Sequence, residues 1–209
     1  MELIVRLLIL AAYASILIEL SALHVPSVAS FRSIWVADDD VTTWYSKKYQ
    51  RLFRLGRPMK IALFLPPLLA VYVVFLFPIP IALFDVHPPL GFAFEPHTAI
   101  RWIAVALILA GRVITLIAVA SMIRAAPSPD SCSLRTSGPF RYSRNPGLAG
   151  MFMMFAGFWI ALPSPIFLAG ILIYIVYMDF KVRMEEDFLA NRFGVEFQAY
   201  REKTNRYLV

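Results

Sequence analysis

The feature that most constrains the fold of this chain is a series of long apolar runs separated by polar stretches. The runs begin near residues 3, 61, 99, 147 and 166. Hydrophobic residues make up 59% of the 209 residues, whereas soluble domains are about 45–50% apolar. A chain of this length cannot bury so much apolar surface in its own core, so the runs require lipid as their solvent. The sequence therefore predicts an all-α membrane protein with about five transmembrane helices.

The runs also indicate where each transmembrane helix begins and ends. We expect these helices over residues 3–23, 61–77, 99–123, 147–162 and 166–180. The first run is too long for the apolar core of a typical signal peptide, and Glu19 interrupts it, so we expect a retained span. Pro66 and Pro67 are expected to kink the second helix, and Pro78 and Pro80 to end it.

The last two runs flank the segment Pro163-Ser164-Pro165, and each is close to the shortest length that spans a bilayer. We expect them to form a tight helical hairpin in which Gly150, Gly157 and Gly170 allow the backbones to approach closely. The charged tail that follows, from residue 181, is expected to be mostly helical.

Charge between the runs predicts the orientation in the membrane. Lys and Arg are frequent in residues 24–60, 124–146 and 181–209 and rare in 85–98 and 163–165. Because cytoplasmic loops carry the excess of Lys and Arg, we expect the N-terminus outside and the C-terminus in the cytoplasm. The net charge of +6 has the same origin. With no basic stripe on a soluble fold, nucleic acid is not an expected partner.

Residues 24–60 contain a different apolar pattern. Side chains recur at roughly helical spacing among Lys, Arg and Gln, at Val41, Trp44, Tyr45, Tyr49, Leu52 and Phe53. This spacing is typical of an amphipathic interfacial helix that lies on the membrane surface. The acidic residues 38–40 are expected to cap its N-terminus.

Arg112 lies close to the middle of the third run. A mid-membrane Arg costs roughly 2.5–3.5 kcal/mol on insertion scales, so it is expected to face the bundle interior. There it could pair with Glu19 or line a tunnel for a lipophilic ligand. Glu19 itself is expected near the solvated end of its span.

Cysteine and histidine contribute no expected site. The lone Cys132 excludes an internal disulfide and Cys-rich zinc sites, and no base lies near it in sequence. His24, His87 and His97 lack the spacing of metal ligands, so no metal site is expected.

The loop after the third run carries the first polar motif. Gly138 permits backbone geometry that other residues avoid, and Pro139 stiffens the turn. Arg144 offers a bidentate contact to an anion, and Asn145 offers both a donor and an acceptor. Pro146 stands where a helix could begin. A rigid loop that leads into a helix N-terminus suits a carboxylate or the polar end of a cofactor.

The second polar motif follows the fifth run. Glu185 and Glu186 lie so close to hydrocarbon that a positive group is expected to meet them, and Lys181 shares a helix face with Glu185. The ammonium group of an amino-acid-like ligand would be one such partner. Gly194 is then expected to stop the helix before a second short helix, whose aromatic residues pack back.

The two motifs together resemble the isoprenylcysteine carboxyl methyltransferase family. The pattern L-x-T-x-G-P-[FY]-x-Y-x-R-[HN]-P begins at Leu134, and E-E-x-x-L-x-x-x-F-G-x-E-[FY]-x-x-Y begins at Glu185. The related phospholipid N-methyltransferases share part of this pattern. The resemblance covers about residues 102–203, so we divide the chain into an N-terminal part, 1–101, and a methyltransferase-like part, 102–209.

The resemblance implies that S-adenosylmethionine binds on the cytoplasmic side and that a lipophilic acceptor enters from the bilayer. Glu185 and Glu186 would hold the ammonium end of the cofactor. Carried over by position, the other residues of the cofactor site would be Gly138, Pro139, Tyr142, Arg144, Asn145, Pro146 and Leu148.

Three residues depart from the family pattern. Asn145 replaces a common His, Leu148 a Tyr, and Lys181 an Arg that is thought to hold the acceptor's carboxylate. Lys181 or Arg183 could still aim a carboxylate such as that of a prenylcysteine. The alternatives are a phospholipid, amine or thiol methyltransferase with the same cofactor site, or a non-catalytic membrane protein of the same fold, which Leu148 and Lys181 favour.

Overall fold

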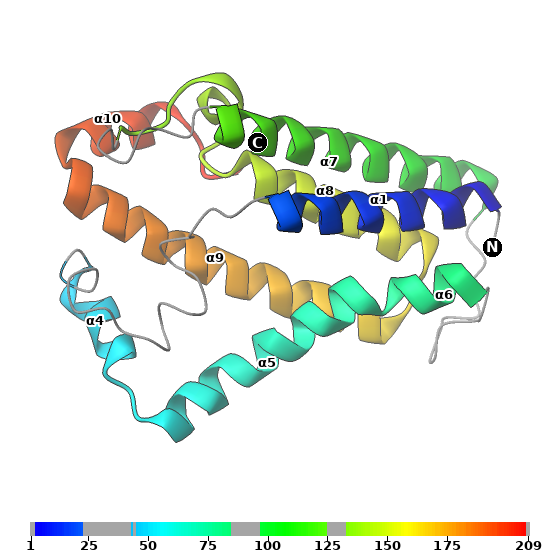
Figure 1. Cartoon of the computed structure of the whole chain (residues 1–209), viewed down its shortest axis with the longest axis horizontal. Coiled ribbons are helices and arrows are strands. Elements are labelled where there is room, and N and C mark those ends of the chain that lie inside the picture. Colours follow the sequence, from blue (N-terminus) through cyan, green and yellow to red (C-terminus); the bar gives the residue numbers. More distant parts are fainter. Residues whose placement is uncertain (1–2, 23–42, 44, 85–96, 125–132, 208–209) are drawn as a thin grey trace.

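The computed structural model describes residues 3–22, 43, 45–84, 97–124 and 133–207. Within these ranges the chain forms helices, turns and loops but no strand (Figure 1), which confirms the predicted all-α class. In chain order the helices are α1 (Leu3–Ala22), α4 (Lys47–Phe53), α5 (Arg57–Leu76), α6 (Pro78–Phe84), α7 (Thr98–Arg124), the 3-10 helix η1 (Gly138–Arg141), α8 (Pro146–Ala161), α9 (Pro165–Phe193) and α10 (Val195–Lys203).

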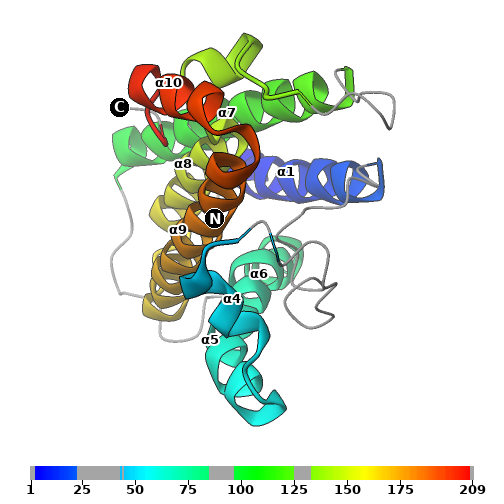
Figure 2. The ribbon, with the colours of Figure 1, turned by 90° about the vertical axis from the view of Figure 1, so that its left-hand side faces the viewer.

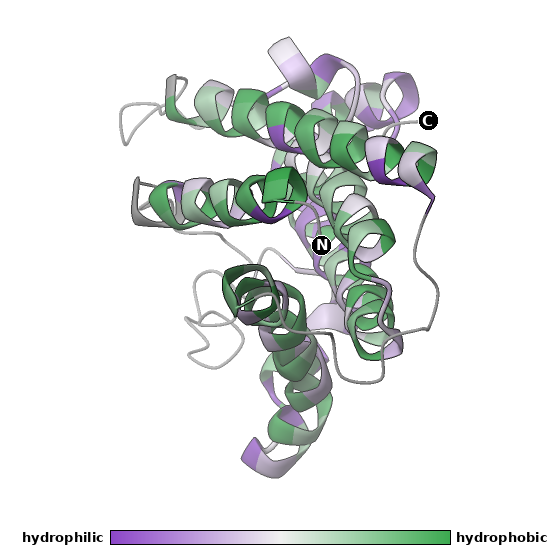
Figure 3. Cartoon of the chain, turned by 90° about the vertical axis from the view of Figure 1, so that its right-hand side faces the viewer, coloured by the Kyte–Doolittle hydropathy of each residue, from purple (hydrophilic) through white to green (hydrophobic). Residues whose placement is uncertain are grey.

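In the described part of the chain, three helical stretches are long and apolar enough to cross a membrane. They are Arg57–Phe84, Thr98–Ile123 and Pro165–Phe193. The apolar helix α8 is shorter, at 16 residues, and the 20-residue α1 occupies the first predicted span. Figure 3 shows hydrophobic residues along most of α1, α5, α6 and α7. All five predicted apolar helices are therefore present, whereas the side of the membrane that each terminus faces stays a prediction.

The second span is longer than the sequence indicated, because Pro78 does not end it. After Phe77 the apolar helix resumes as α6, with Pro78 as its first residue. A proline is tolerated there because the first N–H groups of a helix have no partner within the helix. The Tyr13 hydroxyl donates to the Val74 carbonyl at 2.6 Å, and this is the carbonyl to which an N–H at position 78 would have bonded. α1 thus satisfies a carbonyl that Pro78 leaves without a helical partner.

The last two apolar helices do not form the tight hairpin that we expected. α8 packs along α7, and α9 packs along α5. A Cβ atom added to Gly150 would lie 2.5 Å from the Gly111 carbonyl oxygen of α7, and one added to Gly170 would lie 2.6 Å from Val73 of α5. The small residues do allow close approach, but the two helices diverge from their shared turn to different partners (Figure 1).

Aromatic side chains fill the space between α1, α5, α8 and α9. Tyr13 stacks on Phe158 with ring centroids 5.2 Å apart, and Phe155 meets Tyr174 edge to face at 5.6 Å. All four side chains are buried, whereas Val176 on the outer side of α9 is 71% exposed. An apolar outer surface of this kind suits lipid as the surrounding solvent.

Arg112 pairs with Glu19, which settles one of the two roles that the sequence left open. The Arg112 Nη1 donates to Glu19 Oε2 at 2.9 Å, and Arg112 Nε donates to the Ser15 hydroxyl at 2.6 Å. A further contact, from Nη2 to Oε1, is 2.8 Å long. The Glu19 side chain is only 12% exposed, so the expectation that it is solvated was wrong. Its position along α1 brings it opposite a buried guanidinium that it can neutralise.

The amphipathic segment forms the short helix α4, and its apolar side is covered by protein. Tyr45, Tyr49 and Phe53 are buried in one cluster with Met184 and Phe188 of α9. Figures 1 and 2 both show α4 beside the C-terminal half of α9. The expected contact of this apolar side with the membrane surface is therefore replaced by a contact with α9. Residues 38–42 and position 44 lie outside the described residues, so the acidic cap stays a prediction.

Candidate active site

The loop before α8 has the conformation that its glycine and prolines require. Gly138 has φ of 62°, a left-handed value that favours glycine, and it opens η1. Asn145 precedes the first residue of α8. Pro146 is that first residue, as the sequence predicted, and it is buried. The loop therefore leads directly into a helix N-terminus.

Backbone hydrogen bonds hold this loop against the C-terminal segment. The Arg144 N–H donates to the Asn205 carbonyl at 2.8 Å, and the Asn145 N–H donates to the Arg206 carbonyl at 3.1 Å. The Ser143 hydroxyl also donates to the Arg206 carbonyl, at 3.1 Å. Residues 205 and 206 consequently run alongside the loop and fix its geometry.

The helix α10 folds back onto the same loop. α9 ends at Gly194, which has φ of 50°, and α10 begins with the next residue. Phe197 and Tyr200 are buried, and the Tyr200 hydroxyl donates to the Phe140 carbonyl at 2.6 Å. Burial raises the pKa of Tyr200, so this hydroxyl keeps its proton and remains a donor. The predicted helix stop and the packing of the second short helix are confirmed.

Arg144 of the loop and Glu186 of α9 bring the two sequence motifs together. Arg144 Nε and Nη2 donate to the same oxygen, Glu186 Oε1, at 3.0 and 2.8 Å. The two side chains are only 10% and 11% exposed. Arg144 Nη1 also donates to the carbonyls of Arg201 and Thr204. Such charge-assisted hydrogen bonds between mostly buried side chains are stronger than ion pairs on the surface.

Arg206 adds a second guanidinium to Glu186. Its Nη2 lies 2.6 Å from Glu186 Oε2, and its Nη1 lies 3.3 Å from Asp179 Oδ1. The Tyr207 hydroxyl donates to the same Asp179 oxygen at 3.3 Å. The hydrogen bond to Glu186 raises the pKa of Arg206, and burial together with the Asp179 charge raises the pKa of Tyr207. Arg206 therefore stays cationic and Tyr207 stays a neutral donor.

No motif in the sequence pointed to Asp179, Arg206 or Tyr207 as site residues. Asp179 falls within the last predicted span, where a lone carboxylate is a signal for a nearby cation. The tail supplies such cations, but their pairing across elements follows no fixed spacing in the sequence.

Lys181, Arg183 and Glu185 lie on the same helix in shorter-range pairs. Lys181 Nζ is 3.6 Å from Glu185 Oε1, and Arg183 Nε is 2.7 Å from Asp179 Oδ2. The Arg183 side chain is 57% exposed. Asp179 thus links Arg183 to Arg206 and through it to Glu186.

The other predicted site residues lie along the loop and the start of α8. Pro139 is part of η1, and Tyr142, at 70% exposed, follows it. Leu148 is half-buried in the first turn of α8. In the described ranges, no group of three His, Cys, Asp or Glu side chains is arranged to hold a metal ion. Cys132, His24 and His87 lie outside those ranges.

Comparison with known proteins assigns a class to this region. Residues 99–196, slightly less than half of the chain, match the family model described as Phospholipid methyltransferase. The matched region runs from α7 to the start of α10 and contains both the loop and the acidic residues of α9. Comparisons with curated proteins and with solved structures give no match. The specific resemblance to isoprenylcysteine carboxyl methyltransferases stays a prediction. The phospholipid methyltransferases and the isoprenylcysteine carboxyl methyltransferases belong to one family of integral-membrane methyltransferases. Residues 99–196 are therefore similar to the phospholipid methyltransferases, and the match indicates a membrane methyltransferase.

Proposed function

We propose that this protein transfers a methyl group from S-adenosylmethionine to a lipophilic acceptor that enters from the bilayer. The observation that carries the proposal is the contact between Arg144 and Glu186, at 2.8 Å. It joins the two motifs that suggested a methyltransferase, and both residues lie within the region that matches a methyltransferase family. The apolar helices that surround this region supply the membrane setting that a lipophilic acceptor needs.

The residues at the end of α9 fit the amino-acid end of S-adenosylmethionine. That end carries one ammonium and one carboxylate, so it requires both an acid and a cation. Glu185 and Glu186 would bind the ammonium, and Arg144 would bind the carboxylate. The residues from Gly138 to Leu148 that the family pattern assigns to the cofactor would line the rest of its site.

Glu186 retains room for one further donor. A carboxylate has about four lone-pair sites. Glu186 Oε1 accepts from Arg144 Nε and Nη2 and from Arg206 Nε, whereas Oε2 accepts from Arg206 Nη2. Among the described residues, one lone pair of Oε2 has no donor. Two guanidinium groups thus orient a carboxylate that can still accept a bond from a ligand ammonium.

For the acceptor, we favour the amine of a phospholipid headgroup over a carboxylate. The matched family is described by phospholipid methylation. The two cations that could aim a carboxylate, Lys181 and Arg183, already pair with Glu185 and Asp179. A carboxylate acceptor would compete with Glu185 and Asp179 for these cations, whereas an amine would not.

When bound, S-adenosylmethionine supplies a methyl group on a positively charged sulfur. An amine must lose a proton before its nitrogen bonds to the methyl carbon while the carbon–sulfur bond breaks. Asp179 is a partly exposed carboxylate at this end of α9, at 29%, and it could accept that proton. Otherwise the protein contributes positioning and exclusion of water.

The test is methyl transfer by the purified full chain in lipid nanodiscs with methyl-labelled S-adenosylmethionine. Phosphatidylethanolamine and a prenylcysteine are supplied in separate reactions, and the labelled product is identified by mass spectrometry. We expect label on the phospholipid amine. Label on the prenylcysteine carboxylate would instead support the other acceptor. If calorimetry shows no binding of S-adenosylmethionine and no product forms, the proposal is wrong and the non-catalytic alternative stands.

A further inference from the structure

Helix α4 and the start of α5 carry a dense group of exposed cations. Five Lys or Arg residues occur within eleven positions, and all five are exposed: Lys47, Lys48, Arg51, Arg54 and Arg57. We call this group the α4–α5 basic face. Residues 41–84 contain no Asp or Glu, so no acid within this stretch balances the charge.

The opposite side of α4 is fixed to α9. Tyr45 packs against Phe188 with ring centroids 5.5 Å apart, and the Ser46 N–H donates to Asp187 Oδ2 at 2.7 Å. Tyr45 and Tyr49 are almost fully buried, at 2% and 6% exposed. Burial, with the charges of Glu185 and Asp187, raises the pKa of Tyr45 to about 12. The basic face therefore belongs to an anchored helix, and it points outward because the other side is already packed.

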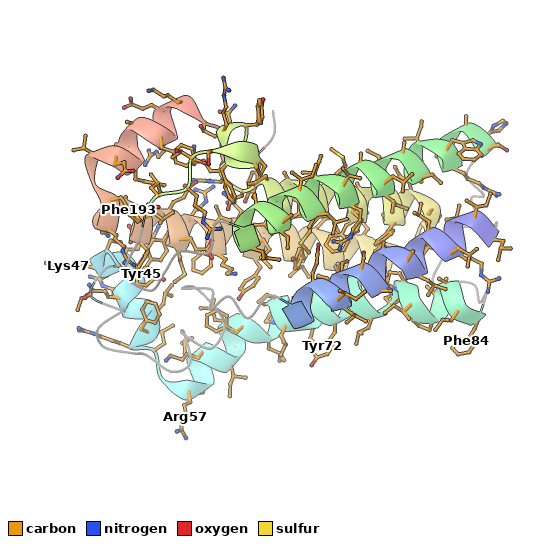
Figure 4. All side chains as sticks on the ribbon, turned by 45° about the horizontal axis from the view of Figure 1, so that its top comes forward. Tyr45, Lys47, Arg57, Tyr72, Phe84 and Phe193 are labelled. Carbon is orange, nitrogen blue, oxygen red and sulfur yellow. The ribbon has the colours of Figure 1, made fainter. Side chains whose placement is uncertain are left out.

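Figure 4 shows the same division of the two sides. Lys47 and Arg57 point away from the rest of the chain, whereas Tyr45 lies between α4 and the end of α9 near Phe193. In the part of the chain that the structure describes, none of the five cations has an ion pair. The Lys48 Nζ atom lies 5.2 Å from the centre of the Tyr49 ring.

The basic face meets an apolar surface at the start of α5. Met59, Ile61 and Leu63 follow Arg57 and are 59%, 50% and 43% exposed. These residues begin a span that is long and apolar enough to cross a membrane. The cations therefore lie at the boundary between hydrocarbon and water, at the level where lipid phosphates are found.

Positive residues at such a boundary often do no more than set the orientation of the span. Two features distinguish this group. Three of the cations, Lys47, Lys48 and Arg51, stand on a helix held by a hydrogen bond and an aromatic cluster, so their backbone needs little ordering before they bind. The group also includes Arg51, Arg54 and Arg57, whose guanidinium groups can contact phosphate oxygens through two hydrogen bonds each.

We propose that the α4–α5 basic face binds the headgroup phosphates of anionic phospholipids. The ligand is identified by its chemistry: a phosphate with net negative charge, attached to acyl chains that cover Met59, Ile61 and Leu63. Because Ser46 and Tyr45 connect α4 to Asp187 and Phe188, such a lipid would bind beside the end of α9 that carries Glu185 and Glu186. Lipid binding at this face does not depend on which acceptor is methylated.

The experiment measures binding of a fluorescent phosphatidylglycerol to the purified full chain in dodecyl maltoside. The variant Lys47→Gln with Arg51→Gln removes two cations from the basic face. The matched control, Arg201→Gln with Lys203→Gln, removes two exposed cations from α10, where Glu196 and Glu202 already balance the charge. Each cation near an anionic lipid contributes about fivefold in binding. We expect the first variant to bind at least tenfold more weakly and the control to stay within twofold of wild type.

Two further readings identify the ligand. Unlabelled phosphatidylglycerol should displace the probe, whereas phosphatidylcholine and inorganic phosphate should not. High salt should weaken binding to the wild type more than to the first variant. Circular dichroism confirms that each variant is folded. Unchanged affinity in the folded first variant, or equal displacement by phosphatidylcholine, would overturn the proposal.

Discussion

Arg144 and Glu186 are 42 residues apart in the chain and form an ion pair at 2.8 Å. The pair connects the loop before α8 to the charged half of α9. It also creates a place where groups of opposite charge lie within hydrogen-bonding distance of each other and at the edge of an apolar bundle.

Replacing Glu186 should weaken cofactor binding. Glu186→Ala removes the carboxylate that two guanidinium groups orient, so we expect the Kd for S-adenosylmethionine to rise at least tenfold, about 1.4 kcal/mol. Isothermal calorimetry measures the change. Glu202→Ala, on the exposed side of α10, is the control and should bind as wild type does. Affinity of the Glu186 variant within a factor of two of wild type would remove that residue from the site.

Lys181 distinguishes the two acceptor classes. If the acceptor is a phospholipid amine, the methyl-transfer rate of Lys181→Gln should stay within about threefold of wild type, because the amine needs no cation to orient it. If the acceptor is a carboxylate, the same change should reduce kcat/KM at least tenfold, or about 1.4 kcal/mol, and Lys181→Arg should preserve or raise it. Rates with each acceptor, measured on the same preparations, decide between the outcomes.

The contact of α7 with α8 should not tolerate a methyl group at Gly150. A Cβ atom there would lie 2.5 Å from both the Gly111 carbonyl oxygen and the Thr115 hydroxyl. Overpacking of this kind costs about 1–3 kcal/mol, and 2 kcal/mol corresponds to roughly 4–8 °C in Tm for a chain of this size. At Gly147 the nearest atom to an added Cβ is 3.7 Å away, so Gly147→Ala should unfold at the wild-type temperature. Equal Tm values for the two variants in detergent would refute the close contact.

The pair of Arg112 and Glu19 should make a large contribution to the docking of α1 on α7. Removing one partner leaves a buried charge alone, which costs about 3–5 kcal/mol. Glu19→Gln and Arg112→Gln should therefore each lower Tm strongly. The double variant should lose less stability than the sum of the losses in the two single variants, since neither charge is then left unpaired. Arg183→Gln breaks an ion pair whose cation is 57% exposed, and it serves as the control with a small expected change. Additive losses in the double variant would show that the two residues act independently.

The sequence predicted the helices well because their signals are local. Apolar runs placed α1, α7 and α8 at nearly the residues where they occur, and they placed the start of α9, which continues past its predicted end at residue 180 to Phe193. The start of α8 at Pro146 and the end of α9 at Gly194 follow from what a proline and a glycine do to their own backbone. The prediction that Pro78 ends the second span was wrong for the same local reason. A residue without an N–H can stand at the start of a helix as well as at its end.

The partners of these helices could not be predicted in the same way. Gly150 and Gly170 indicated close approach, but a glycine does not specify which helix approaches it. Gly150 lies against α7 and Gly170 against α5, both outside the expected hairpin. The two motifs were expected to share one cofactor site, but the direct contact of Arg144 with Glu186 was not predicted. Arg206 was not predicted because it belongs to neither motif. Its ion pairs with α9 join residues at no regular spacing in the sequence.

The hydrogen bonds from Ser143, Arg144 and Asn145 to residues 205 and 206 also set an order of events during synthesis. The partners of this loop leave the ribosome about sixty residues after it does, when α8 and α9 have already been made. Until then the loop's N–H groups and the Glu186 carboxylate must be satisfied by water or by transient neighbours. The polar end of the molecule can therefore be completed only once residues 205 and 206 have been made, and a nascent chain halted before residue 205 would contain the apolar helices that the structure describes but no finished site.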